Sequence, residues 1–291
     1  MFKRIRNNIK YIRSRFSVLT AMAFGLISTL QMFVGWDIFG IKEENVRYKI
    51  LILIALLIAC AVISVIWAVF LSNEVTIFKK DDVEIIVKYD DLMKIAFPKK
   101  HKDERIVVIA TNRCFDTVVD QNLIRDRSVH GQFLQRFAND DTARGSLDSA
   151  IEASMQEFGI AFEMMDRTQK RYGKLKRYPL GSVARITGNN GVTFFLLALT
   201  EFDVDCVAHC DKHQYVDCLL KLFEYYNAHG QGRDLYLYPM GTSMARTGLS
   251  KKEALEATTV LTKISKDNLR AKTTIVVNKN DKNDISITDI S

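Results

Sequence analysis

Two long apolar runs without charge dominate the hydrophobic pattern of the first quarter of this 291-residue chain. Residues 16–36 contain no charged side chain, and neither do residues 50–72. Because an α-helix rises about 1.5 Å per residue, roughly 20 residues cross the hydrocarbon core of a bilayer. The pattern therefore predicts a two-helix transmembrane hairpin over residues 16–72, with spans at about 16–36 and 50–71.

Two other interpretations of these runs fit less well. Helices in the core of a water-soluble protein normally keep a polar face, and neither run has one. A cleaved signal peptide has a shorter apolar region that ends in a small-x-small site, which the first run lacks. Trp36 and Asp37 are more typical of an interfacial anchor and a turn. We therefore expect the first run to be a signal-anchor helix.

Basic residues near the two runs set the expected orientation. The first 15 residues carry six Lys and Arg residues, whereas the loop at 37–49 carries three that three acidic residues offset. Since positive charge favours the cytoplasmic side, both termini are predicted to be cytoplasmic. The predicted organisation is a basic cytoplasmic N-terminus at 1–15, the hairpin at 16–72 and a cytosolic domain at 73–291. The predicted location is the inner (cell) membrane, with the protein multi-pass.

Net charge alone gives a misleading indication of the partner. A formal charge of +7 and a pI near 9.1 are typical of nucleic-acid binding. From residue 73 onward, however, 32 basic residues face 31 acidic ones, a net of +1. The excess therefore indicates membrane topology, and we predict no nucleic-acid partner. The locally basic run Lys170–Arg177 is expected to be a solvated loop or helix face.

Two thiols and two imidazoles come close together in Cys206-Val-Ala-His209-Cys210-Asp-Lys-His213. Zinc favours such ligands, but this stretch has no CxxC spacing. Asp211 instead has the character of a helix N-cap for the run 212–226. No metal site is predicted, and metal analysis of the protein tests the zinc alternative.

Apolar β-branched runs alternate with helical patterns after residue 73, which predicts an α/β layer fold. The last dozen residues are expected to be a terminal hairpin strand or a frayed tail. Strands are expected at Val83–Val87, Ile106–Ala110, Thr193–Leu199, Leu235–Tyr238 and Thr274–Val277, and helices at Gln132–Phe137, Leu147–Phe158, Gln214–Tyr226 and Lys251–Lys266.

Three segments at predicted strand ends are candidates for ligand binding. After the strand that ends at Tyr238, a loop with Gly241 and Gly248 leads to a helix capped by Ser250, with Glu253 at its N3 position. Small residues let backbone N–H groups approach an anion, and the helix N-terminus favours negative charge. The other two segments are Ile109–Thr117 and Lys88–Leu92, whose polar residues have the alternative role of capping turns or helix starts.

Taken together, these segments resemble a macro domain, the ADP-ribose-binding module, in the divergent form that follows two membrane helices in Thoeris anti-phage defence effectors. Asp91-Leu92 resembles the family's Gly-Asp-Ile/Leu, although Asp90 replaces the Gly. Asn112 with 115–117 resembles the Asn-Ala-Ala-Asn segment, which is itself absent. The stretch 128–131 is similar to a first phosphate loop, Gly181–Ala184 to the Gly-x-Ala strand, and 241–248 to a second phosphate loop.

The resemblance implies a macro-like domain with a mixed sheet flanked by helices, and a ligand derived from ADP-ribose rather than a cofactor. In the family that ligand is a nucleotide signal from a TIR-domain NADase, one version being histidine-ADP-ribose. Ligand binding would then drive homo-oligomerisation in the bilayer and disrupt the membrane. The implied ligand-binding residues are Asp91, Leu92, Asn112, Phe115, Asp116, Thr117, His130, Gly131, Gly241, Thr242, Ser243, Met244, Ala245, Arg246 and Gly248.

Two other functions compete with this hypothesis. A membrane-tethered ADP-ribosyl hydrolase would need acid and base groups, for which Asp116 and His130 are the candidates. The sequence shows no nucleophile–base pairing, so we predict a non-enzymatic ligand-binding protein. A transporter or scaffold is disfavoured because the predicted spans contain no ionisable residue for proton or ion coupling.

Overall fold

The computed structural model describes residues 1–36, 45–100, 104–120, 123–139, 146–242, 246–288 and 290. The chain divides into two compact units, one of Met1–Val75 with Lys282–Ser291 and one of Thr76–Asp281. The first boundary lies close to the predicted one at residue 73. The last ten residues differ from the prediction, because they group with the N-terminal unit and not with the cytosolic domain.

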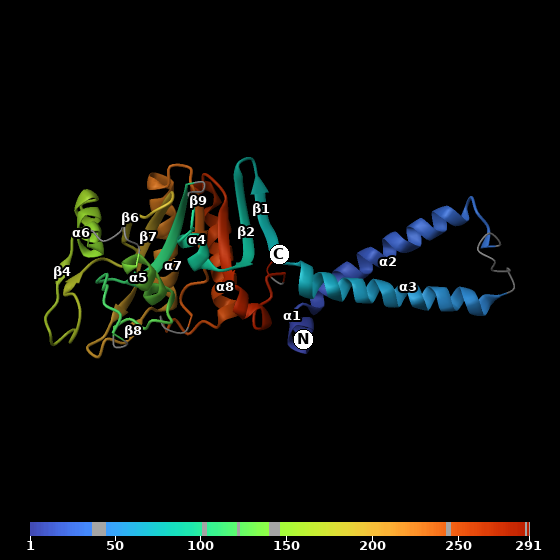
Figure 1. Ribbon diagram of the computed structural model, residues 1–291, viewed down its shortest axis with the longest axis horizontal. Coiled ribbons are helices and arrows are strands. Elements are labelled where there is room, and N and C mark those ends of the chain that lie inside the picture. Colours follow the sequence, from blue (N-terminus) through green and yellow to red (C-terminus); the bar gives the residue numbers. More distant parts are fainter. Residues whose placement is uncertain are drawn as a thin grey trace. The chain divides into compact units, whose positions relative to one another are not determined.

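The N-terminal unit is built from α1 (Phe2–Asn7), α2 (Ile9–Gln31) and α3 (Val46–Ile66), which continues into a π-helical turn, η2 (Trp67–Leu71). Helices α2 and α3 pack against each other as a hairpin (Figure 1). Within the described ranges, one helix, Val46–Leu71, is long and apolar enough to cross a membrane, with a hydropathy of 3.2. The other predicted span, at residues 16–36, lies largely in α2, and its membrane-spanning role stays a prediction. The turn predicted at Asp37 falls outside the described residues.

An eight-stranded mixed sheet forms the centre of the second unit, in the order β1-β2-β10-β9-β3-β7-β6, with β8 paired to β7. Strands β2, β10, β9, β3 and β7 run parallel, and β6 is antiparallel to β7. The strand bounds are β1 Glu74–Lys80, β2 Val83–Asp90, β3 Arg105–Asn112, β6 Val183–Thr187, β7 Val192–Phe202, β8 Ala208–His209, β9 Asp234–Leu237 and β10 Thr273–Asn278, with the separate pair β4 Glu163–Met164 and β5 Lys176–Arg177.

Helices cover both faces of this sheet (Figure 1). Val107 and Ile109 of β3 pack in one apolar cluster with Phe133 of α5 and Met155 of α6. On the other face, α7 packs on β7 and α8. The helix bounds are α4 Leu92–Ala96, α5 Val129–Ala138, α6 Leu147–Glu157, α7 Lys212–His229 and α8 Lys251–Ile264, with the short 3-10 turns η3 Ser265–Asn268 and η4 Lys279–Asn283.

The expected helix starts are confirmed in atomic detail. Asp211 and Ser250 each form a capping box, with Gln214 and Glu253 at the N3 positions. In each box the N-cap side chain accepts from the N3 backbone N–H, and the N3 side chain accepts from the N-cap N–H. These reciprocal bonds satisfy two backbone donors that would otherwise be free, which explains why α7 and α8 begin where the sequence predicts.

Two expectations about polar segments are wrong. The described C-terminal residues, up to 288, form neither a strand nor a frayed tail, because they form η4 and then join the N-terminal unit. The basic run 170–177 is not uniformly solvated either, because the Lys170 side chain is completely buried. A buried ammonium group requires a partner, and its partner lies beside the candidate site.

Candidate functional site

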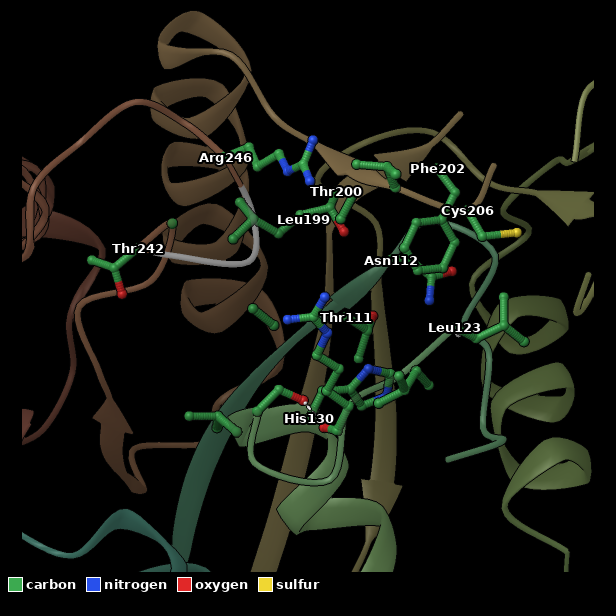
Figure 2. Close-up of a pocket in the computed structure, with 18 of the residues that line it drawn as sticks. Thr111, Asn112, Leu123, His130, Leu199, Thr200, Phe202, Cys206, Thr242 and Arg246 are labelled. Carbon is green, nitrogen blue, oxygen red and sulfur yellow. Dashed lines mark hydrogen bonds between the residues drawn. The ribbon is translucent and has the colours of Figure 1, made fainter. Parts of the chain in front are cut away.

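A cavity of about 620 Å³ opens at the carboxyl ends of the parallel strands β3 and β7. Figure 2 shows side chains from these strands and from the flanking loops around this space. Open α/β sheets bind ligands at this edge, and the volume is within the usual range for small-molecule sites. The lining residues are Ala110, Thr111, Asn112, Leu123, Ile124, Arg125, Arg127, Ser128, Val129, His130, Leu199, Thr200, Phe202, Asp205, Cys206, Val207, Ala208, Tyr238, Gly241, Thr242 and Arg246.

A bulge in β7, opposite the end of β3, lies beside Asn112, which lines the cavity. The register with β7 shifts between Thr111 and Asn112, so that Asn112 lies opposite Thr200. Such bulges commonly re-aim a side chain next to a site. The Asn112 side-chain oxygen accepts from the Cys114 backbone N–H at 2.9 Å. Its buried Nδ2 has no hydrogen-bond partner among the described residues. An unpaired buried amide is costly, so this donor is available for a ligand.

The cavity is lined by three arginines, Arg125, Arg127 and Arg246. No guanidinium group of the three has a hydrogen bond or ion pair with the part of the chain that the structure describes. The carboxylate among the lining residues, Asp205, pairs with Arg171 at 2.9 Å, which offsets part of its charge. The net field in the cavity therefore favours an anionic ligand.

His130 also lines the cavity, in the first turn of α5. Burial, and then the positive charge of Lys174, lower the pKa of His130 from 6.5 to about 3. The imidazole is therefore neutral near pH 7 and offers one donor and one acceptor nitrogen. Ser128 positions this turn, because its hydroxyl accepts from the Gly131 N–H at 2.9 Å.

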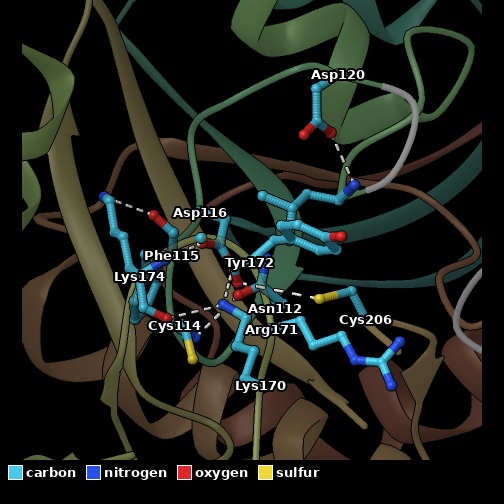
Figure 3. A network of polar contacts seen from close by, with 12 residues as sticks. Asn112, Cys114, Phe115, Asp116, Asp120, Lys170, Arg171, Tyr172, Lys174 and Cys206 are labelled. Carbon is cyan, nitrogen blue, oxygen red and sulfur yellow. Dashed lines mark hydrogen bonds and ion pairs between the residues drawn. The ribbon is translucent and has the colours of Figure 1, made fainter. Parts of the chain in front are cut away.

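A buried ion pair supports the wall of the cavity (Figure 3). Lys170 Nζ lies 2.5 Å from Asp116 Oδ2, and the two side chains are 0% and 1% exposed. Lys170 also donates to the Lys174 carbonyl at 2.9 Å and lies over the ring of Phe202, at 5.4 Å from its centroid. Asp116 accepts a second bond, from the Lys174 N–H at 2.6 Å. The pair thus ties the loop after β3 to the segment that follows Asp166.

The predicted site residues divide into those that line the cavity and those that do not. Asn112, His130, Gly241, Thr242 and Arg246 line it. Gly131 and Gly248 lie next to lining segments, and the predicted Ser243, Met244 and Ala245 lie outside the described residues.

The remaining five predicted residues are engaged elsewhere. Asp91 caps α4, accepting from the Met93 N–H at 2.9 Å, and Leu92 is buried in the core. Phe115 and Asp116 are buried, and the Thr117 hydroxyl donates to Asp148 at 2.7 Å. The ligand-binding roles expected for these side chains stay predictions. A ligand would have to contact them outside the cavity lining.

The described residues on either side of 243–245, in the loop after β9, are bonded to each other. Gly241 has φ +85, a left-handed conformation that favours glycine. The Thr247 hydroxyl donates to the Gly241 carbonyl at 2.7 Å and accepts from the Leu249 N–H at 3.2 Å. These bonds join Gly241 to Thr247 and Thr247 to Leu249, in the segment that the sequence identified as an anion-binding candidate.

Sequence reasoning missed several lining residues. Tyr238 was expected only as the end of a strand, and Phe202, Arg125 and Arg127 were not among the predicted site residues. The one signal that could have found them is their position immediately after strands or before a helix, at the edge where parallel strands end.

The zinc alternative finds no support in the placement of its residues. In the described ranges, no group of three or more His, Cys, Asp and Glu side chains could hold a metal ion. His209 instead contacts Asp203 at 2.9 Å, and Cys206 lines the cavity. Burial raises the pKa of Cys210 to about 12, which keeps its thiol protonated and a poor ligand.

The parallel strands and the cavity at their carboxyl ends define an α/β ligand-binding domain. A family model described as "Thoeris protein ThsA, Macro domain" matches residues 85–278. The chain therefore belongs to the ThsA macro-domain family. The Thoeris protein ThsA of Bacillus amyloliquefaciens (strain Y2) is 27% identical over 237 residues, which cover 80% of this chain and 74% of the relative.

Solved macrodomains are also similar to this chain. A variant of the Oceanobacillus iheyensis macrodomain aligns with a TM-score of 0.46 and 9% identity, over 75% of this chain and 95% of that one. Another variant of that macrodomain, solved with ADPR, aligns with a TM-score of 0.40 and 11% identity, over 75% and 96%.

Proposed function

We propose that this protein is a membrane effector of anti-phage defence whose macro domain binds a signal derived from ADP-ribose. The observation that carries the proposal is the cavity at the ends of β3 and β7, with three arginines and an amide donor that have no side-chain partner among the described residues. Histidine-ADP-ribose, made by a TIR-domain partner, is the ligand that we propose to test first. Binding would drive oligomerisation and disrupt the membrane.

The chemistry of the cavity supports a ligand of this class. A diphosphate carries the negative charge that Arg125, Arg127 and Arg246 can neutralise, and guanidinium groups bind phosphate oxygens in pairs. Asn112 Nδ2 and the neutral His130 can bond to ribose or base oxygens and nitrogens. Phe202 and Tyr238 supply apolar wall for a sugar or base. A nucleotide diphosphate uses all three kinds of surface.

The exposed apolar helix supports the membrane part of the proposal. Only 11% of the most apolar window of Val46–Leu71 is buried. Such a length of exposed aliphatic surface is stable in lipid and unfavourable in water. Residues 16–36, most of which lie in α2, would form the other span. One hairpin cannot enclose an aqueous path, so membrane disruption requires several copies of the chain.

The surroundings of the two candidate acid–base groups favour a binding protein over a hydrolase. Asp116 is buried in its ion pair with Lys170 and does not line the cavity. His130 is held neutral by its low pKa, so it is a weak base near pH 7. The membrane-tethered ADP-ribosyl hydrolase stays the alternative, and multiple turnovers with ADP-ribosylated protein or histidine-ADP-ribose would establish it.

Calorimetry of the detergent-solubilised full chain tests the proposal, with ADP-ribose, its cyclic isomers and histidine-ADP-ribose as probes. Asn112→Asp is the sharpest variant, because it keeps the oxygen that accepts from Cys114 and replaces the free donor by an acidic oxygen. We expect it to weaken binding at least about tenfold, since it opposes an anion and removes a hydrogen bond. Arg136→Ala, on α5 outside the cavity lining, is the control. Absence of binding for every probe contradicts the proposal.

A further inference from the structure

The C-terminal segment returns to the first helix of the chain. Asn283 and Asp284 accept, through their backbone carbonyls, from Asn7 Nδ2 at 3.1 and 3.4 Å. Arg4 Nε donates to the Asn283 side chain at 2.6 Å, and Lys3 pairs with Asp284. The sequence separations are close to the full length of the chain, so this arrangement is a tertiary contact and not a local turn.

The strongest part of this contact is buried and centred on Asn8. Asn8 lies between α1 and α2, and its Oδ1 accepts from the hydroxyls of Ser286 and Thr288, each at 2.8 Å. Its Nδ2 donates to the Arg4 carbonyl at 2.7 Å. The Asn8, Ser286 and Thr288 side chains are all buried. Buried hydrogen bonds of this kind are expensive to break, whereas the half-exposed Lys3–Asp284 pair contributes little.

The same segment also contacts the residue that follows the second helix of the hairpin. Lys282 Nζ donates to the side chain of Asn73, at 2.6 Å, just after the π-helical turn that ends the second helix. Residues 282–288 therefore bond both to Asn8, which precedes the first helix of the hairpin, and to Asn73, which follows the second, all within the N-terminal unit.

The path of the chain makes this segment a second connection to the ligand-binding unit. One connection runs from Val75 to Thr76 into β1, which is at the edge of the sheet. The other runs from Asp281 to Lys282 and follows β10, a central strand paired to β2 and β9. Since β10 is parallel to β9 and β3, its chain leaves the sheet at the carboxyl edge where the cavity opens.

We infer that residues 282–288 form a clasp that transmits ligand binding from the carboxyl edge of the sheet to the base of the hairpin. The inference rests on the proposed function for its input and output. The clasp stays closed during the response, because its bonds hold the residues beside α2 and α3 to the chain that leaves the central strand β10. When the clasp bonds are lost, the hairpin is held to the ligand-binding unit only through the connection into the edge strand β1.

Dye-loaded liposomes of phosphatidylethanolamine and phosphatidylglycerol, carrying the full chain, test this role with histidine-ADP-ribose as the probe. Asn8→Leu removes the acceptor, and the double variant Ser286→Ala with Thr288→Val removes both donors. We expect each to raise the probe concentration for half-maximal release at least about tenfold, with binding by calorimetry unchanged. Asn280→Ala, an exposed change before the clasp, is the control.

Two results overturn the inference. Unchanged release by Asn8→Leu and by the double variant means that the clasp carries no signal. Leakage without probe means that the segment inhibits the hairpin.

Hydrogen exchange separates these results from failure of the proposed function, because it needs no ligand. Without the clasp bonds, amides of residues 2–8 are expected to exchange at least about tenfold faster, while amides of β3 are unchanged. Equal exchange in α1 contradicts the clasp whether or not the probe binds.

Discussion

Replacement of Lys170 by Met breaks the buried ion pair beside the cavity while keeping a side chain of similar length. The ammonium group is 2.5 Å from Asp116 Oδ2 and is fully enclosed. After the change, Asp116 keeps one hydrogen bond, from the Lys174 backbone N–H at 2.6 Å. Its negative charge remains buried, since the side chain is 1% exposed. The loss is therefore larger than that of an ordinary surface pair.

Removal of one partner of a buried pair costs about 3–5 kcal/mol, because the other charge is left uncompensated. A domain of this size is stable by roughly 5–15 kcal/mol, so Lys170→Met should lose a large share of its stability. The double variant Lys170→Met with Asp116→Asn removes both charges and keeps an oxygen for the Lys174 N–H. We expect it to recover at least about 2 kcal/mol relative to the sum of the single changes.

Hydrogen exchange measured by mass spectrometry on the full chain in detergent reads the local free energy of opening in β3 and in the segment 166–174. Lys221→Met is the control, because Lys221 pairs with Asp217 at the surface, where both are about half exposed. That change should cost less than about 1 kcal/mol. A loss for Lys170→Met no larger than for Lys221→Met, or strictly additive effects in the double variant, would refute the reasoning.

Three further predictions concern the cavity and its loops. Because the pKa of His130 is low in the native state, the native imidazole binds its proton only at a lower pH than the unfolded chain does. Stability should therefore fall as the pH drops below 6.5, by at most about 2 kcal/mol near pH 5, and His130→Gln should remove this share in urea titrations. Arg127→Glu should weaken histidine-ADP-ribose binding at least about tenfold and reduce its salt dependence, whereas Arg136→Glu should change neither by calorimetry. Gly241→Ala combines φ +85 with side-chain atoms 3.0 Å from the new Cβ, so thermal unfolding should show a larger loss than Gly232→Ala, which has φ +68 and open space.

The fold was largely predictable because its elements follow local rules. The buried parallel strands are continuous runs of β-branched and aromatic residues, and each of the five expected strands is present. Asp211 and Ser250 mark the starts of α7 and α8 through bonds that reach only three residues along the chain. Short or exposed strands such as β4 and β5 were missed, because two-residue pairings leave no periodic pattern.

The site was less predictable because its residues meet through tertiary contacts. Lys170 is buried only because Asp116, 54 residues away, neutralises it. Nothing in a basic run between two loops indicates such a partner. Asp91 shows the opposite case, in which a carboxylate expected to contact a ligand caps α4. The hydrogen bonds from the clasp residues Ser286 and Thr288 to Asn8 join segments from the two ends of the chain. Sequence patterns give no signal for such a pairing.

Dye release from liposomes that carry the full chain tests the central proposal most directly. Addition of histidine-ADP-ribose should release the dye from liposomes with the parent chain, and Asn112→Asp should release it only at a probe concentration at least about tenfold higher. Release should also rise more steeply than in proportion to the amount of protein, because several hairpins must assemble. Calorimetric binding with no release at any protein density, or equal release by the parent chain and Asn112→Asp, would contradict the account.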